Sequence, residues 1–164
     1  PPSALLILGA SVKVVSSGGE RTIPLSDVYT DYYETTLEPD EIVAELQVPT
    51  QPTDQKWVYI KYLPRTEDDY ATVSVAAMGK LDGGKISDVR VGLGAVGPTA
   101  IRASVVEDKL RGVECSLDAL RAASQEVAAI VDPTTDPRGS AEYKRDMSVV
   151  FTRRALEQVL GVTG

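Results

Sequence analysis

The segment "YATVSVAAMGKLDGGKISDVRVGLGAV", residues 70–96, decides the fold that we predict for this chain. Apolar and small residues alternate along its first half, with Val73, Val75 and Ala77 on one face, which is the two-residue period of a strand. The Asp-Gly-Gly sequence at 82–84 predicts a tight hairpin, because both central positions favour positive φ. The second half of the segment therefore returns antiparallel to the first.

The flanking patterns extend this hairpin into a domain. "KWVYIKYL", residues 56–63, alternates as a neighbouring strand and completes a three-stranded antiparallel meander. Three helices are predicted after it, over 103–112, 116–131 and 140–160. The last helix is expected to bury one face, made of Tyr143, Met147, Val150, Phe151 and Ala155. Strands followed by helices, rather than alternating with them, indicate an α+β fold.

The first 50 residues are predicted to form a separate, smaller structural unit. "ALLILGA" is typical of a helix that ends at Gly9, and strands are predicted near 11–17, 21–25 and 41–49. "LSDVYTDYY" between them predicts a short helix or an irregular loop, with Ser26 or Asp27 as its N-cap. "QPTDQ" has the composition of a linker. We therefore divide the chain into residues 1–50 and 55–161.

The composition excludes several classes of function. The 164 residues carry a net charge of −7, which opposes binding to nucleic acid and to anionic membranes. The absence of histidine excludes serine–histidine triads and histidine zinc sites. The single cysteine, Cys115, is compatible with a reducing compartment, and we expect a cytoplasmic protein. No apolar run approaches the ~20 residues of a membrane-spanning helix. The chain opens without methionine in the middle of an apolar pattern, so we expect it to be a piece of a longer protein.

The sequence contains a G-x-G-x-x-G motif, formed by Gly92, Gly94 and Gly97, which is the motif of a dinucleotide-binding loop. That loop requires a helix that starts within the motif, so that its first amides hold the pyrophosphate. Here Pro98 follows the third glycine directly, where the helix interior should lie. We interpret the glycines instead as a strand that another backbone approaches closely.

Two charged groups near the first hairpin strand leave alternatives open. Glu67, Asp68 and Asp69 precede Tyr70 and could form a solvated loop, a carboxylate pair or a site for a hard cation. Composition favours the solvated loop, because adjacent residues do not face each other on an extended chain and the run lacks the glycine and distant glutamate of a calcium loop. Lys61, on the neighbouring strand, is compatible with an edge-strand charge or with a cation for an anionic ligand.

The last predicted helix and its approach carry five cations in an otherwise acidic chain: Arg138, Lys144, Arg145, Arg153 and Arg154. A solvated helix face explains them. A surface that docks an acidic partner would also explain them, and the residues alone do not choose.

Three segments together resemble one known family. "YIKYLPRTEDDYATVSVAA" at 59–77, "GLGAVGPTAIRA" at 92–103 and "DPRGSAEYKRDMSVVFTRRALEQ" at 136–158 resemble the flavoprotein medium subunit of molybdenum hydroxylases, which include carbon monoxide and xanthine dehydrogenases. "LEPDEIVAELQVP" resembles the strand that ends the family's FAD-binding domain. The resemblance implies that residues 1–50 are the end of that domain and residues 55–161 the C-terminal domain.

The resemblance also implies a cofactor site without catalytic or metal-binding residues of its own. Lys61 matches a lysine that contacts FAD, and Val43 matches a residue that packs on the cofactor. Tyr70 matches the residue on one face of the flavin, and Asp68 and Asp69 would lie near the edge of the ring, where charge tunes its potential. The family's phosphate-binding glycine motifs do not occur in this chain.

The implied function is that of an oxidoreductase subunit that passes electrons through FAD to an acceptor. Its implied partners are a large subunit with the molybdenum cofactor and a small iron–sulfur subunit. The fragment alone is expected to be inactive and to bind FAD weakly. One alternative is a cofactor-free module that docks a partner subunit through the C-terminal helix. The other is a small hydrolase that uses Glu67 and Asp68, and it lacks a base oriented by a third group.

Overall fold

The computed structural model describes residues 2–63 and 70–162 of the chain. Its larger sheet is antiparallel with the order β6-β7-β8-β9. The strands are β6 (Lys56–Tyr62), β7 (Val73–Asp82), β8 (Lys85–Gly94) and β9 (Ile101–Arg102). Gly83 and Gly84 connect β7 to β8 with φ of 55° and 82°. The meander predicted from the sequence is confirmed, and the two-residue β9 extends it beyond β8.

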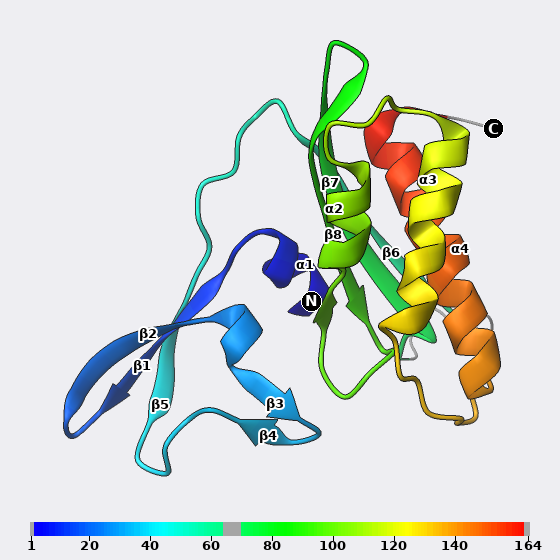
Figure 1. The fold of residues 1–164 in the computed structure, drawn as a ribbon. Helices are drawn as coiled ribbons and strands as arrows, with labels where there is room; N and C mark the ends of the chain where they lie inside the picture. The colour runs from blue at the N-terminus through cyan, green and yellow to red at the C-terminus, as the bar shows by residue number, and fades with distance from the viewer. Residues whose placement is uncertain (1, 64–69, 163–164) are drawn as a thin grey trace.

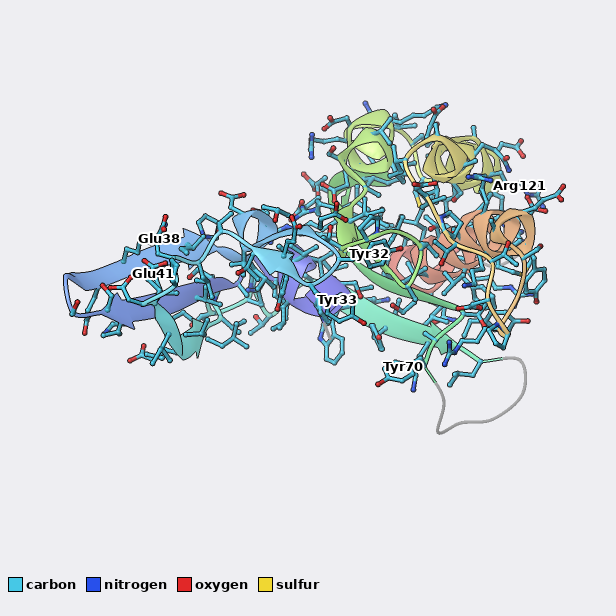
Figure 2. The ribbon with its side chains drawn as sticks, turned by 90° about the horizontal axis from the view of Figure 1, so that it is seen from below. Tyr32, Tyr33, Glu38, Glu41, Tyr70 and Arg121 are labelled. Atoms are coloured by element: carbon cyan, nitrogen blue, oxygen red, sulfur yellow. The ribbon has the colours of Figure 1, made fainter. Side chains whose placement is uncertain are left out.

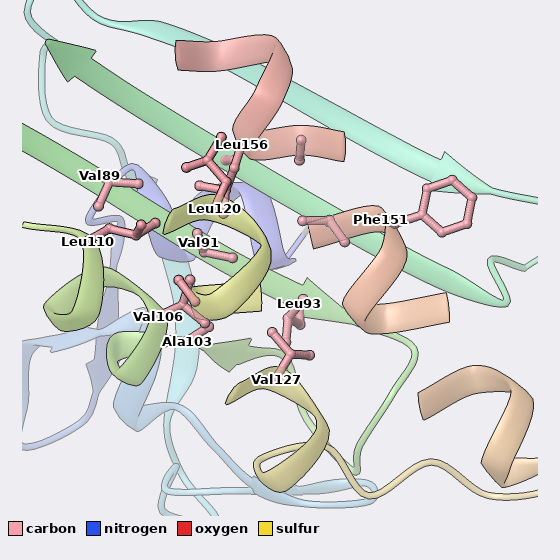
Figure 3. Close-up of a cluster of buried hydrophobic side chains, with 14 of the residues drawn as sticks. Val89, Val91, Leu93, Ala103, Val106, Leu110, Leu120, Val127, Phe151 and Leu156 are labelled. Atoms are coloured by element: carbon pink, nitrogen blue, oxygen red, sulfur yellow. The ribbon is translucent and has the colours of Figure 1, made fainter. Parts of the chain in front are cut away.

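Three helices cover one face of this sheet (Figure 1). They are α2 (Ser104–Leu110), α3 (Leu117–Ser124), which continues as a 3-10 turn over Gln125–Ala129, and α4 (Ala141–Leu160). Side chains from all of these elements form the main core, including Val91, Leu120 and Leu156 (Figure 3). The α+β prediction with about three helices after the sheet is therefore confirmed.

The ends of α3 and α4 follow from local sequence. The Ser116 and Ser140 side chains each accept a hydrogen bond from the backbone N–H three residues later, which satisfies one of the free amides of a helix start. Gly161 ends α4 with φ of 71°.

The face that α4 buries differs from the predicted one. Phe151 and Ala155 are buried as expected, whereas Tyr143, Met147 and Val150 are only half-buried. Their places are taken by polar side chains, which are Lys144, Ser148 and Thr152. Lys144 donates to the carbonyl of Thr134 and pairs with Asp136, and Ser148 donates to the carbonyl of Lys144. Because Lys144 and Ser148 find partners, the helix tolerates a polar stripe that apolar periodicity does not reveal.

A short helix, α1 (Pro2–Ile7), covers the opposite face of the sheet, and it ends before Gly9, where φ is 70° as predicted (Figure 1). It lies directly on β8. A Cβ placed on Gly92 would stand 2.4 Å from the carbonyl oxygen of Ser3, so only glycine allows this approach. The close-approach interpretation of the glycine motif is thus confirmed. The side chains of Arg90 and Arg102 donate to the carbonyls of Ile7 and Leu6 and fix the end of α1.

The remaining N-terminal residues form a small sheet of order β2-β1-β5 and a separate hairpin. The sheet strands are β1 (Ser11–Ser16), β2 (Gly19–Pro24) and β5 (Ile42–Gln47). The hairpin consists of β3 (Tyr29–Asp31) and β4 (Glu34–Thr35), after a 3-10 turn at Leu25–Asp27. The predicted cap is wrong: no side chain caps this turn, because Pro24 precedes it and the Ser26 hydroxyl donates to Asp27.

No helix among residues 2–63 and 70–162 has the length and apolar character needed to cross a bilayer.

Candidate functional site

A pocket of about 930 Å³ lies between the α1 side of the larger sheet and the β3–β4 hairpin. The sheet contributes Lys61, Ser74 and Gly94 to its lining. The segment after β8 contributes residues that include Ala95, Gly97 and Pro98, and the hairpin and Tyr70 add tyrosine side chains. The volume is in the range of sites for drug-sized ligands and cofactors.

The floor of the pocket is a row across three strands. Lys61 pairs with Ser74 in the β6–β7 register, and Ser74 pairs with Gly94 in the β7–β8 register. Directly paired residues project to the same face of a sheet. A Cβ on Gly94 would stand 2.6 Å from Ser74 Oγ and 3.5 Å from Ser3 Oγ. Glycine at this position therefore leaves room beside both serines.

Ser3 leaves an unsatisfied polar atom at this floor. The residue is 1% exposed, lines the pocket, and its hydroxyl has no hydrogen-bond partner in the described part of the chain. A buried hydroxyl without a partner is unfavourable, and a ligand with a polar edge would supply what is missing.

Aromatic side chains surround the opening. Tyr29, Tyr33, Tyr59 and Tyr70 all line the pocket, and Tyr70 is 81% exposed. They come from separate segments: Figure 2 shows Tyr33 on the β3–β4 hairpin and Tyr70 beside the larger sheet. Tyrosine rings around an opening suit a flat aromatic ligand, because aromatic rings attract one another in offset-stacked and edge-to-face arrangements.

Backbone strain also concentrates at this pocket. Among the described residues, Tyr33 and Ala95 are the two non-glycine residues with positive φ, at 59° and 66°. Both line the pocket. Sparsely populated backbone conformations cluster at binding sites, so this observation independently marks the same place.

The electrostatics of the lining are mixed. Lys61 is exposed and forms no hydrogen bond or ion pair with residues 2–63 or 70–162. Asp31 and Glu34 lie on the hairpin side of the same pocket. One unpaired cation on the sheet side is suited to a carbonyl or an anionic group, while the hairpin side repels anions.

The sequence of the larger domain matches a known family. Residues 58–159 match the CO dehydrogenase flavoprotein C-terminal domain. The chain belongs to this family. Residues 1–51 match a second family, described as the FAD binding domain in molybdopterin dehydrogenase. The resemblance inferred from the sequence is thereby confirmed.

Individual members of the flavoprotein family are similar along the whole chain. The carbon monoxide dehydrogenase medium chain of Afipia carboxidovorans is 34% identical over 157 residues, which cover 96% of this chain and 54% of the relative. The xanthine dehydrogenase FAD-binding subunit of Escherichia coli O157:H7 is 29% identical over 160 residues, covering 97% and 55%. The chain therefore spans about half the length of these relatives.

A solved structure shows the same fold. Carbon monoxide dehydrogenase from Hydrogenophaga pseudoflava, in a form that lacks the Mo-pyranopterin moiety of the molybdenum cofactor, superposes with a TM-score of 0.93 at 32% identity. The superposition covers 99% of this chain and 56% of the solved chain.

The structure brings together two of the five predicted cofactor residues. Lys61 lines the pocket from β6, and Tyr70 lines it from the segment that precedes β7. Val43 lies on β5, is 44% exposed, and is not among the pocket residues, so its contact with a cofactor stays a prediction. Asp68 and Asp69 lie outside the described residues, as does Glu67.

The cations of α4 and its approach have different surroundings. Lys144 is buried against Asp136, Arg153 pairs with Glu157, and Arg154 lies over the ring of Phe151. The guanidinium of Arg138 instead lies over the ring of Tyr70, which lines the pocket.

Sequence reasoning missed Ser3, Ser74 and the hairpin tyrosines. The run "YTDYYE" at 29–34 is a local enrichment in tyrosine and offers a signal for the hairpin. Ser3 and Ser74 give no such signal, because only the packing of α1 on β8 brings them together.

Proposed function

We propose that this chain is the C-terminal part of an FAD-carrying electron-transfer subunit of a molybdenum hydroxylase. Membership of the flavoprotein family supports the class, and the match of residues 1–51 to an FAD binding domain supports the cofactor. The relatives named as subunits of carbon monoxide and xanthine dehydrogenases support an oxidoreductase role.

We infer that the pocket holds the isoalloxazine part of FAD. That ring is flat and aromatic, with carbonyl and N–H groups along one edge. One observation carries the proposal. The floor of the pocket, formed by Lys61, Ser74 and Gly94, lies beside the unsatisfied hydroxyl of Ser3, and tyrosines surround the opening above it. The polar side chains of the floor would face the carbonyl and N–H groups of the ring edge, and the tyrosines would contact its flat aromatic surface.

Each residue would have a distinct part in holding the cofactor. The Lys61 ammonium would donate to a polar atom of the ring edge, and Ser3 and Ser74 would hydrogen-bond beside it. Tyr70 would lie against a ring face and exclude water. Val43, Asp68 and Asp69 complete the proposed set, with Val43 packing on the cofactor and the two acids near the ring edge. FAD, when bound, supplies the redox chemistry, and the protein positions and tunes it.

We also propose the division of the chain and its assembly. Residues 1–50 would end the FAD-binding domain and residues 55–161 form the C-terminal domain; the two family matches end at 51 and begin at 58, which supports this boundary. The subunit would receive electrons from a small iron–sulfur subunit, which takes them from a large subunit with the molybdenum cofactor.

The visible absorption spectrum of the full-length protein tests this function. We expect flavin bands, and Lys61→Met should weaken FAD binding because it removes the one cation of the floor. Lys56→Met is the matched control, since Lys56 is exposed on the same strand and does not line the pocket. A colourless protein that still assembles with its partners would favour a cofactor-free docking module, and turnover of a hydrolase substrate without flavin would overturn both.

A further inference from the structure

Tyr70 is highly exposed, yet its ring has a cationic neighbour. The guanidinium carbon of Arg138 lies 5.3 Å from the centroid of the Tyr70 ring. This is within the range in which a cation is attracted to an aromatic face. Arg138 lies 68 positions further along the sequence (138 − 70), in the segment that leads into α4. The contact therefore connects the pocket opening to a second, distant element.

A tight turn at residues 136–139 fixes Arg138. Asp136 and Gly139 exchange two backbone hydrogen bonds of 3.1 Å. The backbone N–H of Arg138 donates to Asp136 Oδ1 at 2.8 Å, and its guanidinium lies 3.4 Å from Asp136 Oδ2. Gly139 has φ of 156°, and a Cβ there would stand 2.8 Å from the Tyr143 ring. Both the backbone and the carboxylate thus hold the arginine in one place.

Asp136 is in turn held by a buried lysine. Lys144, whose side chain is 4% exposed, lies 2.8 Å from Asp136 Oδ2 and donates to the Thr134 carbonyl at 2.8 Å. The hydrogen bond from Lys144, together with the Arg138 N–H, holds the pKa of the Asp136 carboxyl below its usual range, so it stays charged. A buried lysine requires such partners, which makes this connection rigid.

Helix α4, which carries Lys144, also contacts β6, the strand that carries Lys61. The hydroxyls of Tyr143 and Tyr62 lie 2.6 Å apart, and the Tyr62 ring stacks on Phe151 with centroids 4.3 Å apart. Tyr62 follows Lys61 directly in β6. The turn that carries Arg138 and the strand that carries Lys61 are therefore parts of one packed unit.

We propose that Arg138 is a positioning residue that holds the Tyr70 ring at the pocket opening in the orientation in which it meets the flavin. Asp136 and Lys144 hold Arg138. The inference rests on the proposed function, because it assigns the ring a flavin to meet. The contact itself is independent of FAD. Without Arg138, the exposed Tyr70 ring gains rotational freedom and spends less time against the cofactor.

The contact can be measured without flavin. The full-length protein is labelled with 3-fluorotyrosine, and Tyr70→Phe assigns the Tyr70 resonance in the ¹⁹F NMR spectrum. Arg138→Gln should move this resonance towards the position of free fluorotyrosine. The ratio of Tyr70 rings that rotate freely to rings that keep their wild-type orientation should increase about two- to five-fold, which corresponds to the energy of an exposed cation–π contact. Arg138→Lys should restore much of the original shift. Arg154→Gln is the matched control, because Arg154 lies 5.1 Å from the Phe151 ring centroid, away from the pocket. An unmoved Tyr70 resonance in Arg138→Gln would overturn the proposal.

The effect on the flavin is measured in the same variants. We expect Arg138→Gln and Tyr70→Leu to lengthen the excited-state lifetime of bound flavin and to change its rate of reoxidation at least two-fold, with no further change in the double variant. A shifted resonance with unaltered flavin lifetime and reoxidation would show that the contact exists but does not position the ring on the cofactor, which overturns the proposal. Wild-type protein without bound flavin would instead refute the proposed function, and the NMR result would still decide whether Arg138 holds Tyr70.

Discussion

Replacing Gly92 with alanine tests how the pocket floor is built. Gly92 lies on β8 where α1 crosses, and a Cβ would stand 2.4 Å from the carbonyl oxygen of Ser3 and 3.0 Å from Ile7 Cγ2. The first of these neighbours is backbone and cannot rotate away. Arg90 and Arg102 also hold the end of α1 by hydrogen bonds to its carbonyls. The helix must therefore move as a whole.

The magnitude follows from this geometry. Overpacking a well-packed interior destabilises by about 1–3 kcal/mol, and a clash with fixed backbone belongs at the upper end. Alanine also reduces the freedom of the unfolded chain relative to glycine, which offsets about 0.4–1 kcal/mol. We expect Gly92→Ala to lower the free energy of unfolding by about 2 kcal/mol. Because Ser3 moves with α1, FAD binding should weaken in the full-length protein as well.

The assay is equilibrium urea unfolding followed by circular dichroism. Gly18→Ala is the matched control: its Cβ would lie 3.6 Å from Ser16 Oγ, an ordinary contact, and it does not require positive φ. The control should be neutral or slightly stabilising. If Gly92→Ala were as stable as Gly18→Ala, α1 would not be fixed on β8 and the proposed floor would be wrong.

Two further changes test the ion pairs. Lys144→Met should destabilise the chain by about 2 kcal/mol in urea unfolding, because it removes the charged hydrogen bonds of Lys144 to Asp136 and to the Thr134 carbonyl and leaves Asp136 with Arg138 alone; no loss of stability would contradict the role of this pair. Glu41 accepts two hydrogen bonds from Arg21, which with the Glu38 N–H lower the pKa of its carboxyl from 4.5 to about 2. Its stabilising contribution is present above pH 4.5 and is lost as the pH falls towards 2. The difference in melting temperature between wild type and Glu41→Gln should therefore shrink from pH 7 to pH 3, and a constant difference would contradict the pairing.

The larger domain could be predicted from the sequence because its signals are local. The two-residue period and the Asp-Gly-Gly turn define β7 and β8, and serines at 116 and 140 cap two helices. The buried face of α4 could not be predicted, since Lys144, Ser148 and Thr152 look like solvated residues in any pattern based on polarity. Their burial depends on partners such as Asp136 and on the packing of the helix against the sheet.

The candidate site was predictable only in part for a similar reason. Lys61 and Tyr70 belong to segments that resemble a known family, and both line the pocket. Part of the remaining floor and rim comes from α1 and the β3–β4 hairpin, far away in sequence. The placement of Ser3 depends on Gly92, whose missing side chain gives no information about what approaches it.

The central claim is that FAD binds over the pocket floor of Lys61, Ser74 and Gly94. The most direct test is the affinity of the full-length protein for FAD when a larger side chain replaces Gly94. Gly94→Val places a side chain beside Ser3 and Ser74, so it should weaken FAD binding at least about ten-fold, equivalent to about 1.4 kcal/mol. Circular dichroism confirms that the variant is folded, and Gly94→Ala combined with Ser74→Ala provides a milder filling that avoids the contact with Ser74 Oγ. Quenching of flavin fluorescence during titration gives the dissociation constants. Weaker binding in both variants, with Gly18→Ala unchanged, is the result that we predict. Folded variants that bind FAD as tightly as the wild type would show that the flavin lies elsewhere.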